Sequence, residues 1–325
     1  MTTRRELLAV AGMGTLLALP VPGLAQPLRR VGVLVPAPRA GYEQRLAALR
    51  GGLRDLGYVE GKSVAYEYRE SEGRYELLPS LAAELVNRKV HVIVTAGTPA
   101  ALAAKKATTT IPIVIGSISD PVATGVVPSL ARPAGNITGL MFSVAELCAK
   151  RLELIKQAIP RMKRAAMLMN PDNASMEPAQ REMAQAGKTL GVEVMRFDVR
   201  AEAELEDVLQ AMVARRADAV VMVEDAFLNV NAGRLGALAT AKHLPSIGLD
   251  AVAQGGGLLA YGVNQLDMFQ RAATYIDKIF KGARPADLPI QRSSTFDLIL
   301  NLKTARQLGV PVPPELRLRA NQVLE

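Results

Sequence analysis

The stretch VTAGTPAALAAK, residues 94–105, indicates the fold because it passes from an expected strand through a tight turn into an expected helix. Its first residues are apolar and β-prone, Gly97-Thr98-Pro99 interrupts them, and an alanine-rich run follows. Thr98 is a good helix N-cap, and proline suits the first helical position. We therefore expect a helix whose unpaired backbone N–H groups point to one spot above the edge of a sheet.

Strands and helices alternate in the same way over most of the chain. Such alternation is typical of parallel strands joined by right-handed helical crossovers. Two series of about five strands each predict an α/β protein of two Rossmann-like, doubly wound lobes. The expected strands are residues 31–35, 63–69, 90–96, 111–116 and 136–140, and then 165–169, 192–197, 218–223 and 244–248. The expected helices are residues 42–56, 75–88, 144–158, 176–190, 202–214 and 229–242.

The C-terminal tail holds more elements than a lobe of five strands requires. Residues 255–264 and 266–281 have the patterns of a strand and a helix, and a second strand and helix follow within 295–309. We expect the chain to cross back to the first lobe and then again to the second, which gives a multi-strand hinge. The alternative is one extra unit at the edge of a sheet. The expected boundaries are residues 1–25 for a signal peptide, 28–142 plus 262–286 for the first lobe, and 143–261 plus 287–325 for the second.

The composition excludes several function classes. The net charge of +8 comes from basic residues scattered among acidic ones, with no run of five or six and no interleaved aromatics, so we expect no nucleic-acid binding. Cys148 is the only cysteine, which leaves no disulfide framework and no cysteine metal site. His91 and His243 lack a second histidine at helical spacing, so we expect no metal and no cofactor.

The first 25 residues have the pattern of an export signal. Arg4-Arg5 precede an apolar run at residues 7–19, and small residues lie before Gln26. The segment TRRELL resembles a twin-arginine signal, and a general secretory signal with two ordinary basic residues is the alternative. We expect a mature chain that starts near Gln26 and works as a soluble monomer in the periplasm.

Small polar and acidic residues recur where the expected parallel strands end, which is where α/β sheets bind ligands. Helix N-termini and hydroxyls suit an anionic group, and carboxylates on the facing lobe suit an ammonium group. The combination matches an amino acid or a similar zwitterion. For any one residue the alternative is a plain helix cap or turn former. The ligand-binding candidates are Gly97, Thr98, Ser119, Asp120, Asn170, Asn173, Asp225 and Asp250, and the same strand ends carry Ser117, Asp172 and Glu224.

The chain lacks the usual marks of catalysis. It has no G-x-S-x-G elbow, no H-E-x-x-H motif and no Cys-His pair. Glu224 and Asp225 are adjacent, so on a strand they would point to opposite faces, which is a poor start for a paired acid/base site. We therefore expect no catalytic residues and no enzyme activity.

Several segments, taken in order, resemble one protein family. They are LRDLGYVEGKSV (53–64), AGTPAALAAKKATTTIPIV (96–114), SDPVATGVVPSLARPAGNITG (119–139), MNPDN (169–173), GGGLLAYGVN (255–264) and ADLPIQRSSTFDLILNLKTARQLGV (286–310). The set resembles the extracytoplasmic substrate-binding proteins of ABC transporters, in the family that includes tryptophan-binding members. The resemblance runs from about Arg30 to the C-terminus.

The resemblance implies a type I periplasmic-binding-protein fold with two lobes, three hinge strands and a ligand in the cleft between them. It implies that Gly97, Thr98, Ser119, Asp120, Asn170 and Asp225 line that cleft. The implied function is to bind a small polar or aromatic carboxylate or an amino acid and to deliver it to the membrane permease of an ABC importer. Two alternatives stay open here: a receptor that senses a ligand for a signalling partner, and an exported α/β enzyme.

Overall fold

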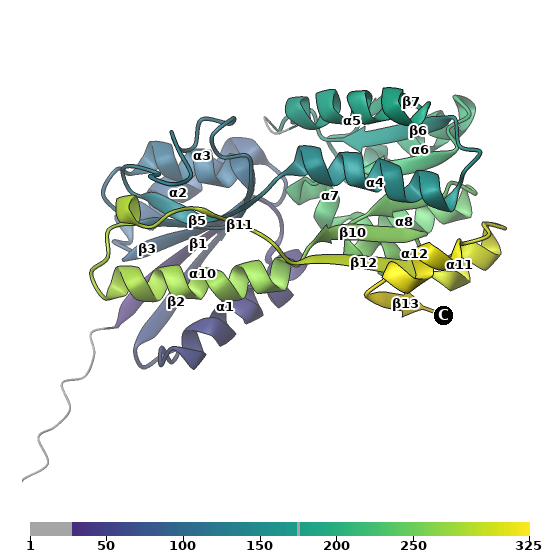
Figure 1. Ribbon diagram of the computed structural model, residues 1–325. Helices are drawn as coiled ribbons and strands as arrows, with labels where there is room; N and C mark the ends of the chain where they lie inside the picture. The colour runs from purple at the N-terminus through teal and green to yellow at the C-terminus, as the bar shows by residue number, and fades with distance from the viewer. Residues whose placement is uncertain (1–27, 174–175) are drawn as a thin grey trace, which may run out of the picture.

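The computed structural model describes residues 28–173 and 176–325, which fold into two α/β lobes that lie side by side (Figure 1). The expected signal peptide lies outside the described residues. Each lobe has one sheet with helices on both faces, so the expected fold of two doubly wound lobes is confirmed. No helix among the described residues is long and apolar enough to cross a membrane.

The first lobe is built on a parallel sheet whose two faces are both covered. Val31 and Val33 pack beneath α1 (Glu43–Asp55) and α10 (Gln265–Phe280), whereas Leu34 packs beneath α2 (Leu78–Asn87) and α3 (Gly97–Ala107). This alternation is what a strand buried on both faces requires. The strands are β1 (Arg29–Val35), β2 (Val64–Glu70), β3 (Val92–Ala96), β4 (Ile113–Ser119), β5 (Ile137–Phe142) and β11 (Gln291–Arg292), in the order β11-β5-β4-β3-β1-β2.

The second lobe has a seven-stranded sheet in the order β13-β12-β10-β9-β8-β6-β7. Its strands run parallel except where β10 pairs with β12. The strands are β6 (Arg164–Met169), β7 (Glu193–Asp198), β8 (Ala219–Met222), β9 (Ser246–Gly248), β10 (Leu259–Val263), β12 (Phe296–Asn301) and β13 (Gln322–Leu324). The helices are α4 (Val144–Ala158), α5 (Met176–Leu190), α6 (Leu205–Ala214), α7 (Ala226–Val230), α8 (Ala232–Ala241), α9 (Asp250–Gln254), α11 (Leu302–Gln307) and α12 (Pro314–Arg319).

The tail passes between the lobes twice. After β10 the chain enters α10, which packs on α1 in the first lobe, and β11 pairs with β5 at the edge of the first sheet. It then returns as β12, which pairs with β10 in the second sheet. The crossings lie later than the sequence suggested, because β10 keeps residues 262–263 in the second sheet and β11 keeps residues 291–292 in the first.

Two local expectations were wrong. Helix α3 starts at Gly97 and its N-cap is Ala96, so Thr98 lies in the first turn and does not cap the helix. The backbone of Gly97 has a φ of 76°, a conformation that glycine adopts without steric cost, and it turns the chain directly from β3 into α3. The helix expected at residues 229–242 is divided into α7 and α8, and α7 already begins at residue 226.

Candidate ligand site between the lobes

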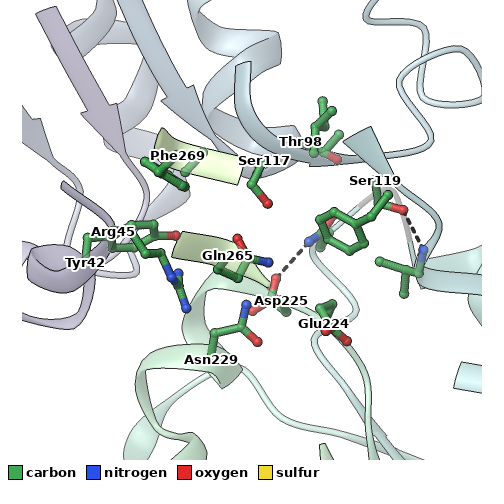
Figure 2. Close-up of a pocket in the computed structure, with 16 residues that line it drawn as sticks. Tyr42, Arg45, Thr98, Ser117, Ser119, Glu224, Asp225, Asn229, Gln265 and Phe269 are labelled. Atoms are coloured by element: carbon green, nitrogen blue, oxygen red, sulfur yellow. Dashed lines mark hydrogen bonds between the residues drawn. The ribbon is translucent and has the colours of Figure 1, made fainter. Parts of the chain in front are cut away.

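A cavity lies between the two lobes at the carboxyl ends of β3, β4, β5 and β8 (Figure 2). Its empty space, including the part that is open to solvent, is about 420 Å³. The first lobe contributes Tyr42, Arg45, Ala96, Gly97, Thr98, Ser117, Ile118, Ser119, Phe142, Gln265 and Phe269. The second lobe contributes Val144, Asn173, Glu224, Asp225 and Asn229.

The wall formed by β3, α3 and β4 suits an anion. The first backbone N–H groups of α3 lack intrahelical partners, and the positive end of the helix dipole lies there. The Thr98 and Ser117 hydroxyls border the cavity from the same wall, and neither hydrogen bonds to another side chain in the described part of the chain. The Ser119 hydroxyl is already engaged, because it donates to Asp120 Oδ2 at 2.8 Å and accepts from the Val144 N–H at 3.1 Å.

Across the cavity, Glu224 offers a buried carboxylate that Arg151 holds in place. Arg151 Nη2 donates to Glu224 Oε1 at 2.7 Å, and Nη1 donates to Oε2. The remaining Arg151 donors reach the carbonyls of Met222 and Tyr261, each at 2.7 Å. Burial raises the pKa of Glu224, and the Arg151 guanidinium opposes that rise. A bidentate pair of this kind fixes the direction in which the carboxylate faces.

Asp225 lies beside Glu224 but is occupied by the protein itself. It caps α7 by accepting hydrogen bonds from the backbone N–H groups of residues 227 and 228. The Asn170 and Asn173 amides donate to it at 3.2 and 2.8 Å. The Tyr75 hydroxyl, which comes from the first lobe, donates to Asp225 Oδ2 at 2.9 Å. Asp225 therefore organises the second-lobe wall and ties it to the first lobe.

Aromatic rings form the apolar part of the cavity. Tyr42 ends the short helix η1 (Arg39–Tyr42), Phe142 ends β5, and Phe269 lies on α10. Burial raises the pKa of Tyr42 to about 12, so its hydroxyl stays neutral. The Arg45 guanidinium lies 4.9 Å from the centre of the Tyr42 ring and forms no ion pair with a described carboxylate. The cavity thus combines flat apolar surface with a cation that has no carboxylate within ion-pair distance among the described residues.

The structure brings some of the predicted residues to this cavity and not others. Gly97, Thr98, Ser119, Asn173 and Asp225 line it. Asn170 does not line it and lies behind Asp225, while Asp120 accepts the hydrogen bond from Ser119 outside the lining. Asp250 borders a different cavity, and its carboxylate accepts a hydrogen bond from the backbone N–H of Ala251, the next residue of helix α9.

Sequence reasoning missed Arg45, Asn229, Gln265 and Phe269 as site residues. All four come from helical segments, whereas the predictions were drawn from strand ends. Ser117, which lies near the end of β4, and Glu224, which follows β8, also line the cavity. The expectation that Glu224 and Asp225 diverge was wrong, because β8 ends at Met222 and both residues border the same space. No group of three or more His, Cys, Asp or Glu residues in ranges 28–173 and 176–325 could hold a metal ion.

Comparisons with known proteins agree with this architecture. The family model described as ABC transporter substrate binding protein matches residues 30–324. The chain therefore belongs to the family of ABC transporter substrate-binding proteins, as its motifs indicated.

Individual relatives share both fold and length. A tyrosine-binding protein from Clostridioides difficile is 24% identical to this chain, and the match covers 79% of this chain and 74% of the relative. A conserved domain protein from Vibrio cholerae has a TM-score of 0.85 at 25% identity, covering 91% of this chain and 99% of that one. An ABC domain from Streptococcus pneumoniae in complex with L-Trp has a TM-score of 0.82 at 25% identity, covering 90% and 100%.

Proposed function

We propose that this chain is the extracytoplasmic receptor of an ABC importer and that it binds an amino acid with an aromatic side chain in the cavity between its lobes. The observation that carries the proposal is the pairing of opposite walls. One wall holds a carboxylate fixed by a buried arginine. The other holds a helix N-terminus and two hydroxyls that make no hydrogen bond to a side chain of the described residues. In this role the chain would pass its ligand to the membrane permease of the importer.

Each part of an amino acid has a matching partner in the cavity. The ligand ammonium group would donate to Glu224, and the ligand carboxylate would accept from the start of α3 and from the hydroxyls of Thr98 and Ser117. The side chain would lie against the rings of Tyr42 and Phe269. The relatives that bind tyrosine and L-Trp support this class of ligand.

Ligand analogues that lack one charged group test the proposal. We expect L-tryptophan or L-tyrosine to raise the melting temperature of the purified chain, because a ligand bound only by the folded state stabilises it. Tryptamine lacks the carboxylate and should bind roughly 10-fold or more weakly than L-tryptophan. Indole-3-propionate lacks the ammonium group and should bind roughly 30-fold or more weakly. Isothermal titration calorimetry after removal of co-purified ligand gives the affinities. Equal affinity for indole-3-propionate and L-tryptophan would exclude an ammonium site at Glu224.

A further prediction concerns closure of the lobes. Tyr75 does not line the cavity, yet its hydroxyl bridges the lobes by donating to Asp225. Tyr75→Phe should therefore weaken ligand binding by about 1–2 kcal/mol, or roughly 5- to 30-fold, because the closed state loses a hydrogen bond to a carboxylate. Small-angle X-ray scattering should show a larger radius of gyration for the ligand-free variant than for the wild type.

Tyr58→Phe is the matched control for this prediction. The Tyr58 hydroxyl also donates to an aspartate, Asp277 Oδ1 at 3.0 Å, but both residues belong to the first lobe. This variant should bind ligand within about 2-fold of the wild type, since it removes the same kind of bond without touching the lobe interface. Indistinguishable affinities of the two variants would show that the Tyr75–Asp225 bond has no part in closure.

A further inference from the structure

The ligand cavity adjoins a second and larger cavity between the lobes. The second cavity has a volume of about 1,130 Å³, including its opening to solvent, and it is bordered by η1, α1, α7, α9, β10 and α10. Three polar residues line both cavities: Arg45 from α1, Asn229 from α7 and Gln265 from α10. We call these three residues the polar collar. They lie near one another at the side of the ligand site in Figure 2.

Two side chains of the polar collar lack partners within the described residues, whereas Arg45 hydrogen bonds to Tyr42. Asn229 Oδ1 is buried and has no hydrogen-bond partner within the described residues. The side-chain amide of Gln265 makes no hydrogen bond in the same part of the chain, and Arg45 has no ion pair with a described carboxylate. A buried carbonyl oxygen without a partner costs free energy, so native proteins rarely retain one without a functional reason.

The collar is assembled from both lobes. Arg45 and Gln265 belong to the first lobe, whereas Asn229 belongs to the second. The three side chains therefore come together when the lobes close, at the point where the far end of a bound ligand would lie. Because the collar opens onto the second cavity, apolar walls do not close off this end of the site. Discrimination among ligands at this end of the site must therefore come from hydrogen bonding.

We infer that the polar collar recognises a hydroxyl group at the end of an aromatic ligand side chain, so that the preferred ligand is a hydroxyphenyl amino acid. This inference rests on the proposed function and adds the part of the ligand that the proposal leaves open. A hydroxyl donates to Asn229 Oδ1 and accepts from Arg45 or from the amide of Gln265. Because it both donates and accepts, the match holds whichever way the Asn229 amide is turned.

Other side-chain ends fit the collar less well. A carboxylate only accepts, so in the amide orientation of this structure it leaves the Asn229 oxygen unpaired. An ammonium group only donates and would lie beside the charge of Arg45. A plain phenyl ring offers neither function and would leave the Asn229 oxygen and the Gln265 amide without a partner. The rings of Tyr42 and Phe269 in the adjoining cavity favour a flat aromatic body between the collar and the amino-acid head.

L-tyrosine and L-phenylalanine form the matched ligand pair that tests the inference, because they differ by one hydroxyl. By calorimetry the wild type should bind L-tyrosine about 10- to 100-fold more tightly than L-phenylalanine. Asn229→Leu should reduce this ratio to nearly one by weakening L-tyrosine binding while leaving L-phenylalanine binding unchanged. Asn87→Leu, at an exposed position at the end of α2, is the control and should keep the wild-type ratio.

The outcomes separate this inference from the proposed function. Equal wild-type affinities for the two amino acids would mean that water satisfies the collar in the complex, which overturns the inference and leaves the zwitterion site standing. A tyrosine preference that survives in Asn229→Leu would also overturn it. If neither amino acid binds, the proposed function fails and the inference fails with it.

Discussion

Replacing Arg151 by methionine should lower the free energy of unfolding by about 3–5 kcal/mol at neutral pH. Both Arg151 and Glu224 are fully buried, with side-chain exposures of 0% and 1%. Methionine fills much of the same volume but leaves the Glu224 carboxylate without its counter-charge, and it removes the donors to two backbone carbonyls. Urea denaturation followed by far-UV circular dichroism measures the loss.

The loss of stability caused by Arg151→Met should become larger as the pH rises. Burial already raises the pKa of Glu224 above its ordinary value of 4.5, and removal of Arg151 takes away the interaction that opposes the rise. A carboxyl group with a raised pKa in the folded state is better accommodated when protonated, so the stability it contributes is lost as the pH rises. The difference between Arg151→Met and the wild type should therefore be smaller at pH 4.5 than at pH 7.5.

A double variant shows whether the unpaired charge is responsible. Arg151→Met combined with Glu224→Leu removes both charges and should recover most of the lost stability, since an apolar pair can replace a buried ion pair. A penalty that is the same at both pH values and persists in the double variant would place the cause in packing and not in the charge of Glu224.

The second large effect concerns binding. Glu224→Gln should weaken the affinity for the amino-acid ligand by about 2–5 kcal/mol, or roughly 30- to 4,000-fold. Glutamine keeps the size of the side chain, yet it removes the negative charge that would face the ligand ammonium group in a buried site. Asp250→Asn is the control, because Asp250 borders only the second cavity. The ligand affinity of this variant should be within about 2-fold of that of the wild type. Circular dichroism at the assay temperature verifies that both variants are folded.

Much of the fold could be predicted because its main signal is local. Strands such as β3 and β4 are buried along their whole length, so their sequences are mostly apolar. The crossings of the tail were harder to place, since β11 has two residues, both exposed, and carries no apolar pattern. Strand β13 and the short helices α9 and α12 were not predicted for a related reason, as pairing and packing with distant elements define them.

Residues of the site were predicted only where they lie at the ends of strands. Thr98, Ser119 and Asp225 lie at or just after the ends of strands, and the topology brings these ends together. Arg45 and Gln265 lie on α1 and α10, which pack against each other across about 220 residues of sequence, and no local pattern marks their cavity-facing sides. Asp225 and Asn170 were correctly placed at the carboxyl edge of the sheet. The hydrogen bond between them could not be predicted from the sequence.

The most direct test of the ammonium site is a calorimetric cycle with two proteins and two ligands. Wild type and Glu224→Gln are each titrated with the preferred L-amino acid and with its analogue in which hydrogen replaces the α-amino group. We predict that the wild type binds the amino acid at least about 30-fold more tightly than the analogue, and that Glu224→Gln binds the two with nearly equal affinity. A preference of the same size in both proteins would contradict contact between Glu224 and the ligand ammonium group, and with it the orientation proposed for the ligand between the lobes.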